Sequence, residues 1–197
     1  MVFDRAEIIQ GKEEYDTLPG SYDDNGEVEQ LVIYLKDRNY NLTLELHYYV
    51  YEKCDIITRS AKLVNSGNES VRLERLMSMQ LDLNESDYEL SFFNGAWARE
   101  MNRSRIPLRA GKYVNESVTG TSSNRANPFF MIGRSSTTED YGECYGFNLI
   151  YSGNHYEAAQ VNSYGKLRLV SGINPATFSY IIEAGKCFEA PEAVLTY

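Results

Sequence analysis

The chain has 197 residues, of which 43% are hydrophobic, and a formal net charge of −9 at pH 7. That length and apolar content fit one globular domain with a complete core and argue against a disordered chain. Because no basic stripe is present to neutralise phosphates, the charge argues against nucleic acid and anionic membranes as partners.

The first turn signal in the chain is Asp23-Asp24-Asn25-Gly26, and the next clear pattern runs from Asn41 to Val50. In that segment the leucines, Tyr48 and Val50 alternate with polar residues that include His47. A period of two predicts a half-buried strand whose polar side, with His47, faces solvent. A second turn is predicted over residues 65–68, where Asn, Ser and Gly cluster.

The same alternation returns at Val71 and Leu73, at Leu81 and Leu83, and from Phe147 to Tyr151. Residues 70–83 also show a helical spacing of apolar side chains, but β-branched Val71 favours a strand there. Strands of about 6–9 residues between turn signals predict an all-β fold of antiparallel sheets packed as a sandwich. Because residues 191–197 are themselves strand-like, we expect residues 1–197 to be a single, partial domain of a longer protein.

The three cysteines, Cys54, Cys144 and Cys187, are far apart and lack the spacing of a zinc site. We predict free thiols, at least two of them buried, in a cytoplasmic protein. Neither a metal ion nor a cofactor is expected. The first residues show no signal-peptide pattern, so we expect no glycans on the sequons at Asn41, Asn68, Asn84, Asn102 and Asn115.

Hydrolysis of a glycosidic bond needs two carboxylates that flank it. The candidate acids all lie in or beside turns: Asp23 and Asp24, Glu85 and Asp87, and Glu139, Asp140 and Glu143. Acidic residues in turns are usually solvated, so we assign none of them as catalytic. His47 and His155 have no serine or cysteine partner in a recognisable motif, and no glycine-rich phosphate loop is present.

The only tryptophan lies in the segment Gly95-Ala96-Trp97-Ala98-Arg99-Glu100. A Trp face beside polar groups can stack on a pyranose ring, which makes Trp97, Arg99 and Glu100 candidates for substrate binding. The other interpretation is that Trp97 anchors a sheet or an interface while Arg99 and Glu100 pair with neighbouring groups. We favour it, since Trp and Arg are also common anchors of protein interfaces.

Gly120 to Met131 is a polar turn that runs into an aromatic strand. Short polar side chains in such a turn bond to nearby backbone and stiffen it, and Pro128 favours an extended residue before it. The turn residues are Ser122, Ser123, Asn124, Arg125 and Asn127. They predict a rigid corner on the surface.

This turn is one of an ordered series of motifs that covers nearly the whole chain. The others are Gly11-Lys12, Gln30 to Ile33, Ile57 to Ser60, Asn94 to Glu100, Glu143 to Phe147, Tyr151 to Asn154, Gly172 to Pro175 with Phe178, and Gly185 to Val194. In their order and spacing these motifs resemble the N-terminal domain of α-galactosidases in glycoside hydrolase family 36.

The resemblance implies a galactose-mutarotase-like β-supersandwich of antiparallel sheets. It is expected to be incomplete at its N-terminal side, because the family's domain begins before this chain. The resemblance also implies a parent enzyme that removes terminal α-linked galactose from melibiose, raffinose and related galacto-oligosaccharides, or transfers it.

In that family both catalytic aspartates lie in a (β/α)8 barrel after this domain. No catalytic residue is therefore carried over, and the chain alone is expected to be inactive. Its expected partners are the barrel and the other subunits of a tetramer-like homo-oligomer, with residues 122–127 at one of these interfaces.

A stand-alone carbohydrate-binding module is the alternative, with Trp97 and surface tyrosines as stacking platforms. An epimerase-like enzyme on the same fold is the weakest interpretation. It needs a histidine and a carboxylate that face one sugar, and only His47 and His155 are available.

Overall fold

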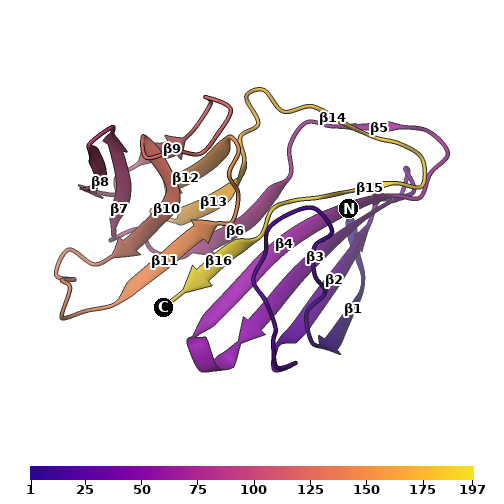
Figure 1. Ribbon diagram of the computed structural model, residues 1–197, viewed down its shortest axis with the longest axis horizontal. Helices are drawn as coiled ribbons and strands as arrows, with labels where there is room; N and C mark the ends of the chain where they lie inside the picture. The colour runs from indigo at the N-terminus through magenta and orange to yellow at the C-terminus, as the bar shows by residue number, and fades with distance from the viewer.

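The computed structural model describes residues 1–197 and consists almost entirely of antiparallel strands (Figure 1). The strands are β1 (Val2–Gln10), β2 (Glu29–Lys36), β3 (Leu42–Tyr51), β4 (Ile56–Asn65), β5 (Val71–Leu73), β6 (Met77–Leu83), β7 (Glu89–Ala96), β8 (Arg99–Pro107), β9 (Gly111–Glu116), β10 (Ala126–Gly133), β11 (Cys144–Leu149), β12 (His155–Val161), β13 (Leu167–Ile173), β14 (Tyr180–Ile182), β15 (Cys187–Glu189) and β16 (Ala193–Thr196). The only helical element is a 3₁₀ turn, η1 (Glu52–Cys54). The predicted all-β antiparallel class is therefore confirmed.

The strands form three sheets. The largest runs in the order β1-β2-β3-β4-β16-β11-β10-β7-β8, with β15 paired to β4. A second sheet has the order β6-β13-β12-β9, and β14 pairs with β5 in a short arm. The second sheet packs on β10 and β11, whereas β1 to β3 extend away from it (Figure 1).

The main core lies between these two layers, where 13 buried residues form one cluster. Phe130 of β10 and Phe147 of β11 stack there with ring centroids 4.8 Å apart. Leu167 and Leu169 of β13 join the same cluster. Because every second residue of a strand faces the opposite sheet, the alternation in the sequence produces this core directly.

The strand predicted over residues 41–50 is β3, but the prediction that its polar side faces solvent is wrong. His47 and Tyr49 are buried on that side, whereas Val50 on the leucine side is 40% exposed. The segment between β1 and β2 covers the His47 side. Lys12 Nζ lies 4.8 Å from the centre of the Tyr49 ring, and Ser21 bonds to the Tyr51 hydroxyl at 2.6 Å.

The leucine side of β1 to β3 is instead an apolar face that is only partly covered. Ile8 and Tyr48 share this side, because both pair with Leu31, and the Ile8 side chain is 77% exposed. Val50 and Ile57 form another exposed cross-strand pair on this side. We call this surface the open sheet face.

Residues 70–83 form β5 and β6, so the strand interpretation of that segment is confirmed. The three thiols are free, but the prediction that at least two are buried is wrong. Cys54 and Cys187 are exposed and Cys144 is half-buried. Cys54 lies in the η1 turn, and Cys187 lies in β15, which pairs with β4 alone.

Strand β16 joins the two halves of the large sheet, because Val194 pairs with Thr58 of β4 on one side and with Asn148 of β11 on the other. Glu192, just before β16, is fully buried and forms an ion pair with Lys12 (Oε2–Nζ 3.2 Å). Ser21 donates its backbone N–H (2.8 Å) and its hydroxyl (2.6 Å) to the same carboxylate. One carboxylate therefore ties the segment between β1 and β2 to the joint of the sheet.

We expect Glu192→Ala to destabilise the chain strongly, because it leaves the Lys12 ammonium buried without a counter-charge. Removing one partner of such a pair costs about 3–5 kcal/mol. The double variant Lys12→Met/Glu192→Leu leaves no buried charge and is expected to recover part of that loss. Urea unfolding followed by circular dichroism measures both variants. A double variant that is no more stable than Glu192→Ala would contradict this account.

Candidate functional site

The hairpin between β7 and β8 carries the tryptophan on a constrained backbone. Its turn consists of Trp97 and Ala98. Ala98 (φ 59°) and Met101 (φ 54°) both adopt the left-handed conformation that non-glycine residues seldom take. Gly95 is required beside them, because a Cβ there would collide with the backbone of Arg99. The hairpin therefore has one well-defined shape.

The structure brings Trp97, Arg99 and Glu100 together at the tip of this hairpin, where they take different roles. The Trp97 side chain is 91% exposed, and Arg99 is also exposed. The Glu100 carboxylate instead accepts the N–H of Ala98 (2.9 Å) and so holds the turn. None of the five principal hollows in the surface is lined by Trp97, so a partner would meet this side chain as a projection.

The turn before β10 is bonded to the turn between β11 and β12. The Ser122 N–H donates to the Ser152 carbonyl (2.8 Å) and its hydroxyl donates to the Tyr151 carbonyl (3.1 Å). Asn154 accepts the N–H of Gly120 (2.7 Å). Polar side chains thus hold the turn, as expected of this composition.

The other turn residues, like those of the hairpin, either hold the backbone or project into solvent. The Ser123 hydroxyl accepts the N–H of Arg125 (3.3 Å), and the Asn127 amide donates to the Phe93 carbonyl (3.1 Å). The side chain of Asn124 makes no such bond, and Arg125 is exposed. Ser122, Ser123 and Asn127 therefore shape the turn, while Arg125 faces outward.

The turn and the hairpin lie next to one another, because Ala126 of β10 pairs with Asn94 of β7. Two segments that the sequence presents separately therefore form one end of the molecule. We call its exposed part the hairpin–turn surface, defined by Trp97, Arg99, Met101 and Arg125. Two arginines project there from a chain whose net charge is −9.

A buried acid is linked to the turn through Asn115. Glu157 of β12 is 2% exposed, and Asn115 donates one amide group to both Glu157 Oε2 (2.8 Å) and the Asn127 carbonyl (2.7 Å). The other Glu157 oxygen has no partner, and burial raises the pKa of this carboxyl to about 8. Sequence reasoning missed Glu157, although its alternation with core residues Ala159 and Val161 places it on the inner face of β12.

His155 lies two residues earlier on the same strand and is fully buried, with neither ring nitrogen hydrogen-bonded. Burial lowers the pKa of this imidazole to about 4, against a smaller opposing effect of Glu116. His155 therefore stays neutral inside the domain, and it has no nucleophile to activate.

These two groups predict how stability depends on pH. Between pH 4.5, its ordinary pKa, and about pH 8, Glu157 is protonated in the folded chain and ionised in the unfolded chain. Its contribution to the free energy of unfolding therefore falls as pH rises through that range. Between pH 6.5 and about pH 4, His155 is protonated in the unfolded chain and neutral in the folded chain. Its contribution to the free energy of unfolding therefore falls as pH decreases through that range. The two effects oppose one another, and stability should be greatest between pH 4.5 and 6.5.

Glu157→Gln keeps an acceptor for Asn115 and removes the titration. We expect this variant to be more stable than the wild type at pH 8 and to lose the decline above pH 6.5, since each pKa unit corresponds to about 1.4 kcal/mol. Thermal unfolding from pH 4 to 9 measures the difference, with exposed Glu183→Gln as the control. The same decline in both variants would contradict a neutral, buried Glu157.

The acidic residues weighed as catalytic pairs make local contacts instead. Asp23 accepts the N–H of Glu27 (2.9 Å), Glu85 pairs with Arg134, and Glu143 accepts the Tyr197 hydroxyl (3.2 Å). Asp24, Asp87, Glu139 and Asp140 are exposed. No group of three or more His, Cys, Asp or Glu side chains is arranged to hold a metal ion, and no helix is long and apolar enough to cross a membrane.

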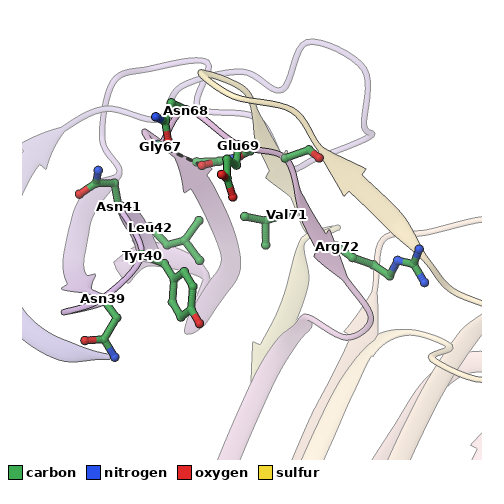
Figure 2. Close-up of a pocket in the computed structure, with 11 residues that line it drawn as sticks. Asn39, Tyr40, Asn41, Leu42, Gly67, Asn68, Glu69, Val71 and Arg72 are labelled. Carbon is green, nitrogen blue, oxygen red and sulfur yellow. Dashed lines mark hydrogen bonds between the residues drawn. The ribbon is translucent and has the colours of Figure 1, made fainter.

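The largest of these five hollows lies far from the hairpin (Figure 1), between the β2–β3 turn and the β4–β5 turn (Figure 2). Its volume is about 700 Å³, within the usual range for small-molecule sites. Leu42 and Val71 point toward one another across it, with the Tyr40 ring beside Leu42. The sequence predicted the turn over residues 65–68 but not the hollow, because the two walls come from separate turns.

Comparison with known proteins identifies the family. Residues 1–183 match the model of the glycosyl hydrolase family 36 N-terminal domain. The chain is 39% identical over 191 residues to α-galactosidase AgaA of Geobacillus stearothermophilus. The alignment covers 96% of this chain and 26% of AgaA. It is 35% identical to the bifunctional α-galactosidase/sucrose kinase AgaSK of Mediterraneibacter gnavus, in an alignment that covers 100% of this chain and 21% of AgaSK.

Solved structures agree. The crystal structure of the α-galactosidase from Lactobacillus brevis superposes with a TM-score of 0.96 at 38% identity, covering 98% of this chain and 26% of that one. An AgaA variant in complex with raffinose gives a TM-score of 0.97 at 38% identity, covering 99% and 27%. The chain thus spans about a quarter of the length of these relatives. It belongs to the glycosyl hydrolase family 36 N-terminal domain family.

Proposed function

We propose that the chain is the non-catalytic N-terminal part of an α-galactosidase, where it supports the catalytic (β/α)8 barrel and a tetramer-like homo-oligomer. The observation that carries this proposal is the hairpin–turn surface. Trp97 and Arg99 belong to the residue types that dominate interface energetics. Their backbone is already held in one conformation, so little entropy is lost when they bind a partner.

The open sheet face supports the same role. Ile8, Val50 and Ile57 are exposed on it, and contiguous apolar surface of this kind usually marks a contact with further protein. In the proposal, the rest of the parent enzyme covers it. The domain then has two contact regions, one apolar and one built around Trp97.

The parent enzyme, in this proposal, hydrolyses terminal α-D-galactosyl residues of melibiose- and raffinose-type sugars. The raffinose-bound structure of the similar AgaA supports that substrate class. The barrel supplies both catalytic carboxylates and this chain supplies none. A cytoplasmic location is proposed with it, since three free thiols suit a reducing compartment.

A stand-alone carbohydrate-binding module is the second candidate function. It is favoured by one observation, the large hollow of Figure 2 with its exposed tyrosine.

We expect the isolated chain to show no turnover of p-nitrophenyl α-D-galactopyranoside, and the full-length protein that carries it to hydrolyse this substrate. The reason is that the paired carboxylates of a glycosidase must flank one bond. Release of p-nitrophenol measures both. Turnover by the isolated chain that a single carboxylate substitution abolishes would overturn the proposal.

Trp97→Ala in the full-length protein is expected to weaken the contact that Trp97 anchors by about 30-fold, because truncating such an anchor costs about 2 kcal/mol or more. Light scattering reports loss of the oligomer, and a lower kcat reports loss of barrel support. The thermal midpoint of the isolated chain should not change, since Trp97 is 91% exposed.

Tyr164→Ala is the matched control, because this tyrosine is 87% exposed at the β12–β13 turn. It should leave oligomer mass and kcat as in the wild type. If Trp97→Ala does the same, the hairpin is not an interface anchor.

A further inference from the structure

The walls of the hollow in Figure 2 are held rigidly by hydrogen bonds. In the β2–β3 turn, Asp37 accepts the N–H groups of Asn39 (2.8 Å) and Tyr40 (3.0 Å). The Ser66 N–H donates to the Asn41 carbonyl (2.8 Å), which ties this turn to the β4–β5 turn. The hollow is therefore formed before any ligand arrives, and binding costs little reorganisation.

Asn65 holds the β4–β5 turn, which forms the second wall of the hollow. It is 1% exposed, and its amide donates to the carbonyls of Glu69 (2.8 Å) and Ile182 (3.1 Å). Its oxygen accepts the N–H of Gly67 (3.0 Å). The Asn65 side chain is thus occupied by hydrogen bonds that shape the hollow.

The other polar groups around the hollow remain available to a ligand. The side chains of Asn39, Asn41 and Asn68 are exposed and make no hydrogen bond within the chain. Each amide can both donate and accept, as a sugar hydroxyl does. The Tyr40 ring, 67% exposed, adds an apolar face of the kind that packs on a pyranose.

The charges around the hollow select among ligand classes. The Glu69 carboxylate faces into it, whereas the Arg72 guanidinium points away (Figure 2). A carboxylate accepts hydrogen bonds from hydroxyl groups and repels an anion. The lining therefore disfavours phosphates and carboxylates and suits an uncharged polyhydroxyl compound.

We propose that this hollow is a non-catalytic binding site for neutral oligosaccharides, with Tyr40 as the stacking platform and Asn39, Asn41, Asn68 and Glu69 as hydroxyl partners. The proposal rests on the hollow that favours the second candidate function, and it does not depend on the supporting role. It lies on other elements than the Trp97 hairpin, so the two can be tested separately.

The test is a titration of the ¹⁵N-labelled 197-residue chain with raffinose, followed by the amide shifts of residues 39–42 and 65–72. We expect saturable shifts in these two turns and none at the Trp97 hairpin. Glucose 6-phosphate, which is anionic, should bind more weakly. An absence of saturable shifts at these turns, or tighter binding of glucose 6-phosphate, would overturn the proposal.

Tyr40→Ala should weaken raffinose binding about tenfold through the lost stacking, and Glu69→Gln should weaken it to a smaller extent. Both residues are exposed, so the dispersion of the amide spectrum should persist and show that the variants fold. Trp97→Ala is the matched aromatic control and should bind as the wild type does. If Trp97→Ala loses binding and Tyr40→Ala keeps it, the sugar site is at the hairpin and this proposal fails.

Discussion

The pairing of β16 with strands on both of its sides is the contact on which the rest of this domain depends. Only this short strand connects the β1–β4 half of the large sheet to the β11–β8 half. Glu192 precedes it and is held by Lys12 and Ser21, which come from the other end of the chain. The first and last segments therefore close the domain together. A buried charge pair of this kind adds little net stability, because desolvation offsets most of the attraction.

The β7–β8 hairpin, at one edge of the large sheet, carries an unfavourable backbone. Ala98 and Met101 hold left-handed conformations at the hairpin tip, which cost stability. The Asn115 amide links the neighbouring turn to buried Glu157, and the Asn127 amide links that turn to Phe93 of β7. A neutral acid and a neutral imidazole inside the sandwich are further costs. The well-packed core between the sheets compensates for them.

Much of the fold could be predicted from local patterns, because alternation reports which residues share a face. It identified β3, β6 and β11 and the turns between them. It did not predict which face of a strand is covered by other segments. His47 and Tyr49 are buried on a side of β3 that the segment between β1 and β2 reaches through Lys12, and exposed Cys187 lies in β15, which pairs with a single strand. Neither neighbour is close in the sequence.

The sequence by itself determined the antiparallel all-β class and the family, since these depend on residue types at fixed spacing. It also singled out the Trp97 hairpin and the polar turn at Ser122. Only the tertiary structure decided that these two segments adjoin, that buried Glu157 is linked to the turn through Asn115, and that Tyr40 and Glu69 share one hollow. The physical reason is that sheet pairing brings distant segments together, and burial and pKa follow from that environment.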